Sequence, residues 1–91
     1  MEPYDTHPET RQDLEYRELD DGGVVYDTAF ERIHTLNATA AYIWNLCDGT
    51  RSVSEIAEGL HQATGIHPDQ ALVDVVTLLV DFRNQGLLQT K

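Results

Sequence analysis

The chain has 91 residues, which is the size of one domain with a modest core and little room for a deep active-site cavity. Its hydrophobic content of 41% suits an ordinary globular fold, while its formal charge of −10 disfavours binding to the phosphate backbone of nucleic acids. No apolar run approaches the roughly 20 residues that a membrane span needs, so no membrane contact is expected.

Residues 1–11 predict a flexible N-terminal arm, because they hold two prolines, several charges and almost no apolar pattern. The folded domain is expected over residues 12–91. The arm is acidic and polar instead of basic and then apolar, which is unlike a secretory signal peptide. Cys47 is the single cysteine, so an internal disulfide is excluded. These features together predict a cytoplasmic protein.

Three short strands are expected next. Leucine and tyrosine residues over 14–19 suggest the first strand, Val24–Tyr26 the second and Glu31–Leu36 the third. The sequence Asp20–Gly23 predicts a hairpin turn, because its glycines permit positive φ angles. A second turn over residues 27–30 then completes a small antiparallel meander.

A first helix is predicted to begin after Asn37, which is a good N-cap, and to stop at Asp48-Gly49. Apolar residues recur along it at spacings of three and four, which predicts one buried face. That face holds Ala40, Ile43, Trp44 and Cys47.

Two further helices follow. Ser52 and Glu55 form a capping box at the start of the second helix, and Gly65 ends it. Pro68 suits the first position of the third helix, which runs to about Gln85. Helices two and three, joined by a short turn and lying beside a small sheet, predict an α+β fold of winged helix-turn-helix-like type.

Catalytic and metal-binding patterns are missing from the sequence. The four histidines and Cys47 show no CxxC, HxxxH or HExxH spacing, and Cys47 fits a small buried hydrophobic residue better than a ligand. No GxSxG motif or Gly-rich phosphate loop occurs either. We therefore expect neither enzymatic activity nor a bound metal or cofactor.

The third helix has an unusually wide apolar arc of about 200–220° at 100° per residue. One interpretation is a central helix that the rest of the domain covers. The other is that part of the arc lines a groove for a partner. A DNA-recognition helix is disfavoured, because Arg83 is the only positive charge over residues 68–85, against three aspartates.

The order of these motifs resembles the PqqD family. The resemblance covers roughly residues 12–90 and rests on LNATAAYIWNLCDG at Leu36–Gly49, the SVSE capping box, GIHPD at Gly65–Asp69 and QGLL at Gln85–Leu88. It implies a three-stranded sheet followed by three helices, and binding of the leader region of a ribosomally made precursor peptide. In that family the leader pairs with the third strand and lies against the third helix. Carried over, the peptide-binding positions are Arg32, Ile33, His34, Thr35, Leu36, Val75, Leu78, Leu79, Phe82 and Arg83.

The resemblance also implies a partner enzyme, such as a radical SAM protein in PQQ biosynthesis or a leader peptidase in a lasso-peptide pathway. Two other functions stay open from the sequence. One is a winged-helix DNA-binding transcriptional regulator, and the other is a structural subunit that dimerises through the apolar arc of the third helix.

Overall fold

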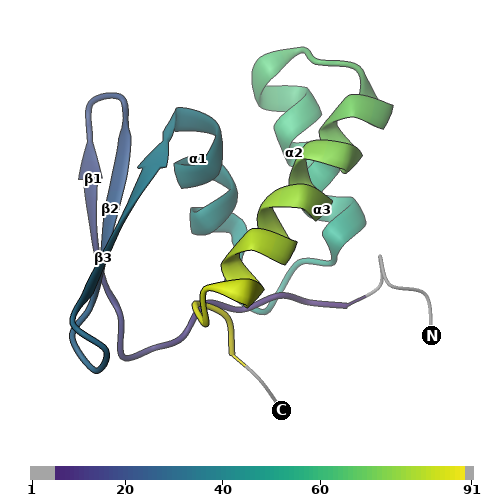
Figure 1. Cartoon of the computed structure of the whole chain (residues 1–91). Helices are drawn as coiled ribbons and strands as arrows, with labels where there is room; N and C mark the ends of the chain where they lie inside the picture. Colours follow the sequence, from purple (N-terminus) through teal and green to yellow (C-terminus); the bar gives the residue numbers. More distant parts are fainter. Residues whose placement is uncertain (1–5, 90–91) are drawn as a thin grey trace.

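The computed structural model describes residues 6–89, in which a three-stranded sheet precedes three helices (Figure 1). The strands are β1 (Glu15–Leu19), β2 (Gly22–Asp27) and β3 (Arg32–Asn37), and the helices are α1 (Ala38–Leu46), α2 (Val53–Thr64) and α3 (Pro68–Asn84). The sheet lies on one side of the molecule and α2 and α3 on the other, with α1 between them. This order confirms the α+β expectation of an antiparallel sheet followed by three helices.

The sheet has the strand order β1-β2-β3, so β1 and β3 are its two outer strands. The first hairpin is tighter than the sequence predicts, because Leu19 pairs with Gly22 and only Asp20-Asp21 form the loop. Gly22 and Gly23 therefore lie within β2 and not in the turn, and their lack of a side chain lets neighbouring residues pack closely against the strand. A Cβ atom on Gly23 would lie 2.5 Å from the ring of Tyr16.

The predicted helix caps are confirmed. The side chain of Asn37 accepts a hydrogen bond from the N–H of Ala40, and Ser52 and Glu55 form the reciprocal capping box of α2. His67 caps α3 through Nδ1, which accepts from the N–H of Asp69 at 3.1 Å. Local sequence thus sets where each helix begins.

The core joins the sheet to all three helices. Trp44 is central to it: its ring stacks on Tyr16 of β1 at 6.2 Å between centroids and meets Phe82 of α3 edge-on at 5.3 Å. The predicted buried face of α1 is confirmed. The buried apolar residues are Val25, Ala40, Ile43, Trp44, Cys47, Val53, Ile56, Ala57, Leu60, Ala71, Val75, Phe82 and Leu87.

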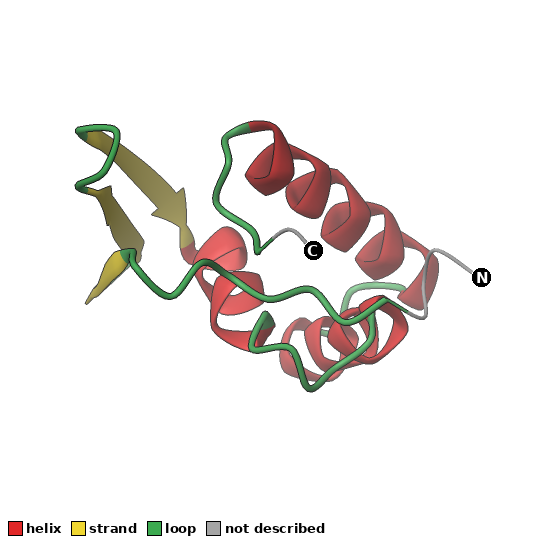
Figure 2. Cartoon of the chain, turned by 90° about the horizontal axis from the view of Figure 1, so that it is seen from below, coloured by secondary structure: helices red, strands yellow, loops and turns green. Residues whose placement is uncertain are grey.

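The N-terminal segment differs from the expected flexible arm over residues 1–11. Its described part, residues 6–11, runs from β1 across the helices (Figure 2). Backbone N–H groups of Thr10 and Arg11 donate to the carbonyls of Cys47 and Leu87, each at 3.0 Å. The N–H of Gly49 donates back to the carbonyl of Pro8 at 3.1 Å. In a flexible arm these backbone groups would form hydrogen bonds with water, whereas here they are paired with distant parts of the chain. Residues 1–5 of the predicted arm lie outside the described residues.

Candidate functional site

The outer strand β3 has a free edge, because within residues 6–89 it pairs with β2 alone. Successive side chains of a strand point to opposite faces. His34 and Leu36 lie partly buried on the face that packs toward the helices, whereas Ile33 and Thr35 lie exposed on the other face. Ile33 is 67% exposed. The predicted strand positions are therefore all on an edge strand, but only alternate ones face the core.

The predicted positions on α3 fall into three groups. Val75 and Phe82 are 0% and 1% exposed, so their side chains belong to the core and have no surface to offer a peptide. Leu78 and Leu79 are partly buried, and Arg83 is exposed. The sequence could not distinguish these groups. Helical periodicity shows which residues lie on the apolar side of the helix, but not which of them are buried by other elements of the fold.

Partly buried apolar residues lie on both sides of the buried stripe, with Leu78 on one side and the others on the opposite side. At 100° per residue, Leu79, Leu72, Arg83 and Val76 follow one another around that side of the helix. The three apolar members of this group are only partly buried. We call Leu72, Val76, Leu79 and Arg83 the α3 flank. Sequence reasoning proposed Leu79 and Arg83 but omitted Leu72 and Val76, although the same periodicity contains them.

The α1 helix connects these two surfaces. It begins directly after β3, through the cap residue Asn37, and it packs on β2, β3, α2 and α3. Both views of the chain show the sheet and α3 standing apart, with α1 and the C-terminal segment between them (Figures 1 and 2). Because α1 packs against both β3 and α3, the packed core fixes the position of the β3 edge relative to α3.

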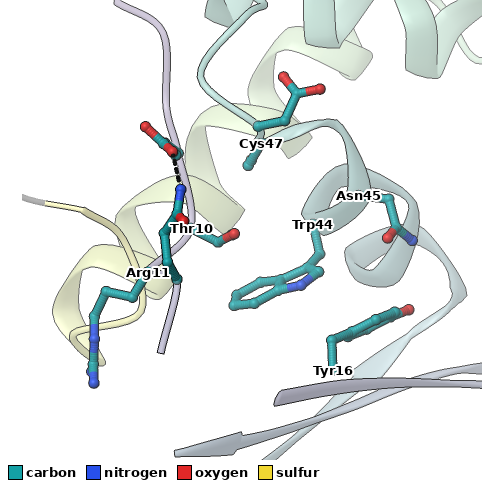
Figure 3. A pocket seen from close by; sticks show the side chains of 9 residues that line it. Thr10, Arg11, Tyr16, Trp44, Asn45 and Cys47 are labelled. Carbon is teal, nitrogen blue, oxygen red and sulfur yellow. Dashed lines mark hydrogen bonds between the residues drawn. The ribbon is translucent and has the colours of Figure 1, made fainter. Parts of the chain in front are cut away.

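A pocket of about 310 Å³ lies elsewhere, between the N-terminal segment and α1 (Figure 3). None of the predicted peptide-binding residues lines it. Its walls include Tyr16, the ring of Trp44 and the buried thiol of Cys47, and the Arg11 side chain points away from the rings. Burial raises the pKa of the Cys47 thiol to about 12, so the thiol is neutral near pH 7 and a poor nucleophile. The full lining is Glu9, Thr10, Arg11, Gln12, Tyr16, Trp44, Asn45, Cys47 and Asp48.

The guanidinium of Arg11 connects three parts of the chain. It donates to the carboxylate of Asp27 at 3.1 Å, to the carboxylate of Asp13 at 2.6 Å and to the carbonyl of Gly86 at 2.9 Å. It also lies over the ring of Phe30, 5.6 Å from its centroid. The hydrogen bonds that Arg11 donates to Asp13 and Asp27 raise the pKa of Arg11, and the same guanidinium lowers the pKa of Asp13. Sequence reasoning missed this cluster, whose members are far apart along the chain.

Neither a cluster of metal-ligating side chains nor a membrane-spanning helix is found in the part of the chain that the structure describes. Across residues 6–89, no three His, Cys, Asp or Glu side chains gather as they would to hold a metal ion. Over the same range, no helix has both the length and the apolar character needed to cross a bilayer.

Comparison with solved structures shows close similarity of fold. TbiB1 in complex with the TbiA(beta) leader peptide matches with a TM-score of 0.81 at 18% identity, over 91% of this chain and 96% of that one. Lasso peptide synthetase B1 complexed with the leader peptide gives 0.80 at 21% identity, over 92% and 99%. The PqqD truncation of Methylobacterium extorquens PqqCD, a stand-alone RiPP recognition element, gives 0.76 at 24% identity, over 99% and 100%.

Comparison with curated proteins gives no match. A family model, Coenzyme PQQ synthesis protein D (PqqD), matches residues 7–88. Because this match covers nearly the whole chain and agrees with the fold, the chain belongs to the PqqD family.

Proposed function

We propose that this protein binds the leader region of a ribosomally made precursor peptide and presents it to a modifying enzyme. One observation carries the proposal: β3 is an outer strand with a free edge, held by the same core as the partly exposed apolar α3 flank. The similar solved structures of TbiB1 and lasso peptide synthetase B1, each in complex with a leader peptide, support it.

The physical basis is strand addition. An edge strand carries backbone N–H and C=O groups that an extended peptide can pair with, which supplies affinity with little dependence on side chains. Alternate side chains of the added strand then point to the face that carries His34 and Leu36. We infer that they meet partly buried apolar residues of α3 there, which supplies apolar contact.

We infer a binding role without catalysis. The buried Cys47 has a raised pKa, and the pocket beside it has no histidine or serine among its lining residues to act as a base or nucleophile. The chemistry then belongs to a partner, such as a radical SAM enzyme or a leader peptidase. A single free, buried cysteine suits the reducing cytoplasm, where such pathways operate.

The arrangement of α2, the turn and α3 beside a β-hairpin also suits a winged-helix-like description. DNA binding is the less favoured function for this arrangement. The exposed face of α3 carries Asp69 and Asp81, with Arg83 as its single cation, and that charge repels a phosphate backbone.

An amide-shift titration tests the proposal. The isotope-labelled protein is titrated with the leader of a short precursor encoded beside its own coding sequence. Shifts that cluster on β3 and the α3 flank support strand addition. Shifts that cluster on α2 and spare both segments would show that the site is wrong, and no binding would reject the function.

Substitutions on α3 sharpen that titration. Leu78→Asp and Leu79→Asp each put a charge at a predicted contact position and should weaken leader binding. The matched control Val73→Asp changes a residue of the same helix that is 57% exposed, and it should weaken binding less. Thr35→Pro removes a backbone donor of β3 and should also weaken binding if that N–H faces the free edge. Circular dichroism checks that each variant keeps its fold.

A further inference from the structure

His34 carries a polar atom that the fold leaves without a partner. Its Nε2 is buried and makes no hydrogen bond to any residue between 6 and 89. Across the ladder His34 is paired with Val25, which is fully buried and apolar. A buried ring nitrogen without a partner destabilises the protein, so its presence in this position needs an explanation.

The position of His34 in β3 suggests what would reach it. A peptide strand added to the free edge of β3 sets one residue directly opposite His34. The two side chains then lie on the same face, with Cβ atoms about 4.5–5.5 Å apart. A side chain of the bound peptide is therefore the nearest new partner for the imidazole ring.

Two arginines with no ion pair accompany this histidine. Arg11 and Arg51 are engaged with aspartates, whereas Arg32 and Arg83 form no ion pair within the described residues. Arg32 precedes His34 by two positions and so shares its face of the strand. Arg83 belongs to the α3 flank. The start of β3 and the end of α3 both lie at the lower side of the molecule in Figure 1.

We propose that His34, together with Arg32 on the same face of β3 and Arg83 near the end of α3, recognises an Asp or Glu side chain of the leader at the position opposite His34. The carboxylate accepts a hydrogen bond from the ring, and the two guanidinium groups favour its negative charge. The chain as a whole is strongly acidic, with a net charge of −10. An acidic leader is thus repelled elsewhere and attracted to this end of the groove, which gives the site its selectivity. This inference rests on the proposed strand addition to β3.

The first test uses a surface-displayed library of random extended peptides, sorted for binding to the full chain. Binders of the parent protein should share Asp or Glu at one register position. Sorting against His34→Leu should remove that preference. Arg17→Ala is the matched control and should leave the preference unchanged. Arg17 also forms no ion pair with the other described residues, and it lies on the opposite face of the sheet from Tyr16 and the core.

The outcomes separate the two proposals. Binders with no shared acidic position, or the same acidic position in the His34→Leu sort, would overturn the role of His34 while leaving strand addition standing. A library that yields no binder would overturn the proposed function and this inference with it.

A second test is a double-mutant cycle with one selected peptide. Replacing its Asp by Asn, or His34 by Leu, should each weaken binding roughly tenfold, which is the effect of losing one charge-assisted hydrogen bond. The two changes together should weaken binding little more than either alone. If His34→Leu does not fold, Arg83→Ala on the helix surface takes its place. Additive effects of the peptide and protein changes would overturn the inference.

Discussion

Arg11 and Asp27 are 16 residues apart in sequence, yet their side chains form an ion pair, with Nη1 of Arg11 3.1 Å from Oδ2 of Asp27. Asp27 ends β2 and is 2% exposed. The same guanidinium also donates to the carbonyl of Gly86, just beyond α3. The pair thus connects the N-terminal segment, the sheet and the end of α3, and it fixes the distance between the two proposed walls of the peptide groove.

The first prediction concerns this pair. Arg11→Ala leaves the buried Asp27 carboxylate without its cation, so the melting temperature should fall by several degrees. Arg51→Ala is the control, because it breaks an ion pair with Asp48 in which both side chains are over 40% exposed, and such pairs contribute little. Thermal unfolding followed by circular dichroism gives the comparison. If both variants lower the melting temperature equally, the Arg11–Asp27 pair contributes no more to stability than an exposed ion pair.

The second prediction concerns Trp44, which contacts both Tyr16 and Phe82. Trp44→Ala removes this contact between sheet and helices and should lower the free energy of unfolding by about 3–5 kcal/mol. Tyr42→Ala, on the same helix but at the surface, should cost much less. Urea unfolding measures both. A Trp44→Ala protein with a midpoint close to that of the parent would contradict the central position of this ring.

The third prediction concerns Gly22. A Cβ atom there would lie 1.9 Å from the carbonyl oxygen of Leu36, which is backbone and has little freedom to move. Gly22→Ala should therefore separate β2 from β3 and weaken leader binding as well as stability. Gly65→Ala is the control. Its φ of 76° is strained for alanine, at about 1–2 kcal/mol, but nothing lies within 4 Å of the new atom.

Amide spectra distinguish these two glycine variants. Gly22→Ala should shift resonances throughout β2 and β3, whereas Gly65→Ala should shift only those near the end of α2. Unchanged β3 resonances in Gly22→Ala would show that the sheet adapts to the added atom.

The fourth prediction concerns the N-terminal segment, which composition alone suggests can be removed. Deleting residues 1–11 eliminates the backbone bonds of Thr10 and Arg11 and the side chain that pairs with Asp27. The truncated protein should therefore unfold at a lower temperature than the full chain. A chain beginning at Thr6 is the control and should keep most of the stability. Equal melting of all three proteins would support the original view of a dispensable arm.

The fifth prediction is a pH dependence at the start of α2. The backbone N–H of Ser52 donates to Glu55 at 2.8 Å, and this bond is the main cause of a lowered pKa for Glu55. A carboxylate whose pKa is lower in the folded state stabilises the protein above its unfolded value of 4.5, and this contribution disappears as the pH falls through the folded value. The difference in melting temperature between the parent and Glu55→Ala should therefore shrink from pH 7 toward acid. A constant difference would mean that the charge of Glu55 contributes nothing to the cap.

The sequence by itself determined the elements and most of the core. Asn37, Ser52 and His67 cap helices by bonding to N–H groups two or three residues away, and the face of α1 around Trp44 follows from apolar spacing. These are short-range effects of backbone geometry and hydrophobic periodicity, so they can be read without knowing what packs where. The motif order pointed to the family for the same reason, since its pieces are caps, turns and buried faces.

Only the tertiary structure decided the use of each side chain. It buried Val75 and Phe82 in the core and left the α3 flank partly exposed. It also left Nε2 of His34 without a hydrogen-bond partner among residues 6–89. It also docked residues 6–11 through hydrogen bonds to partners near residues 47 and 87. These results depend on which distant segments meet, and neither the composition nor the periodicity of a segment contains that information.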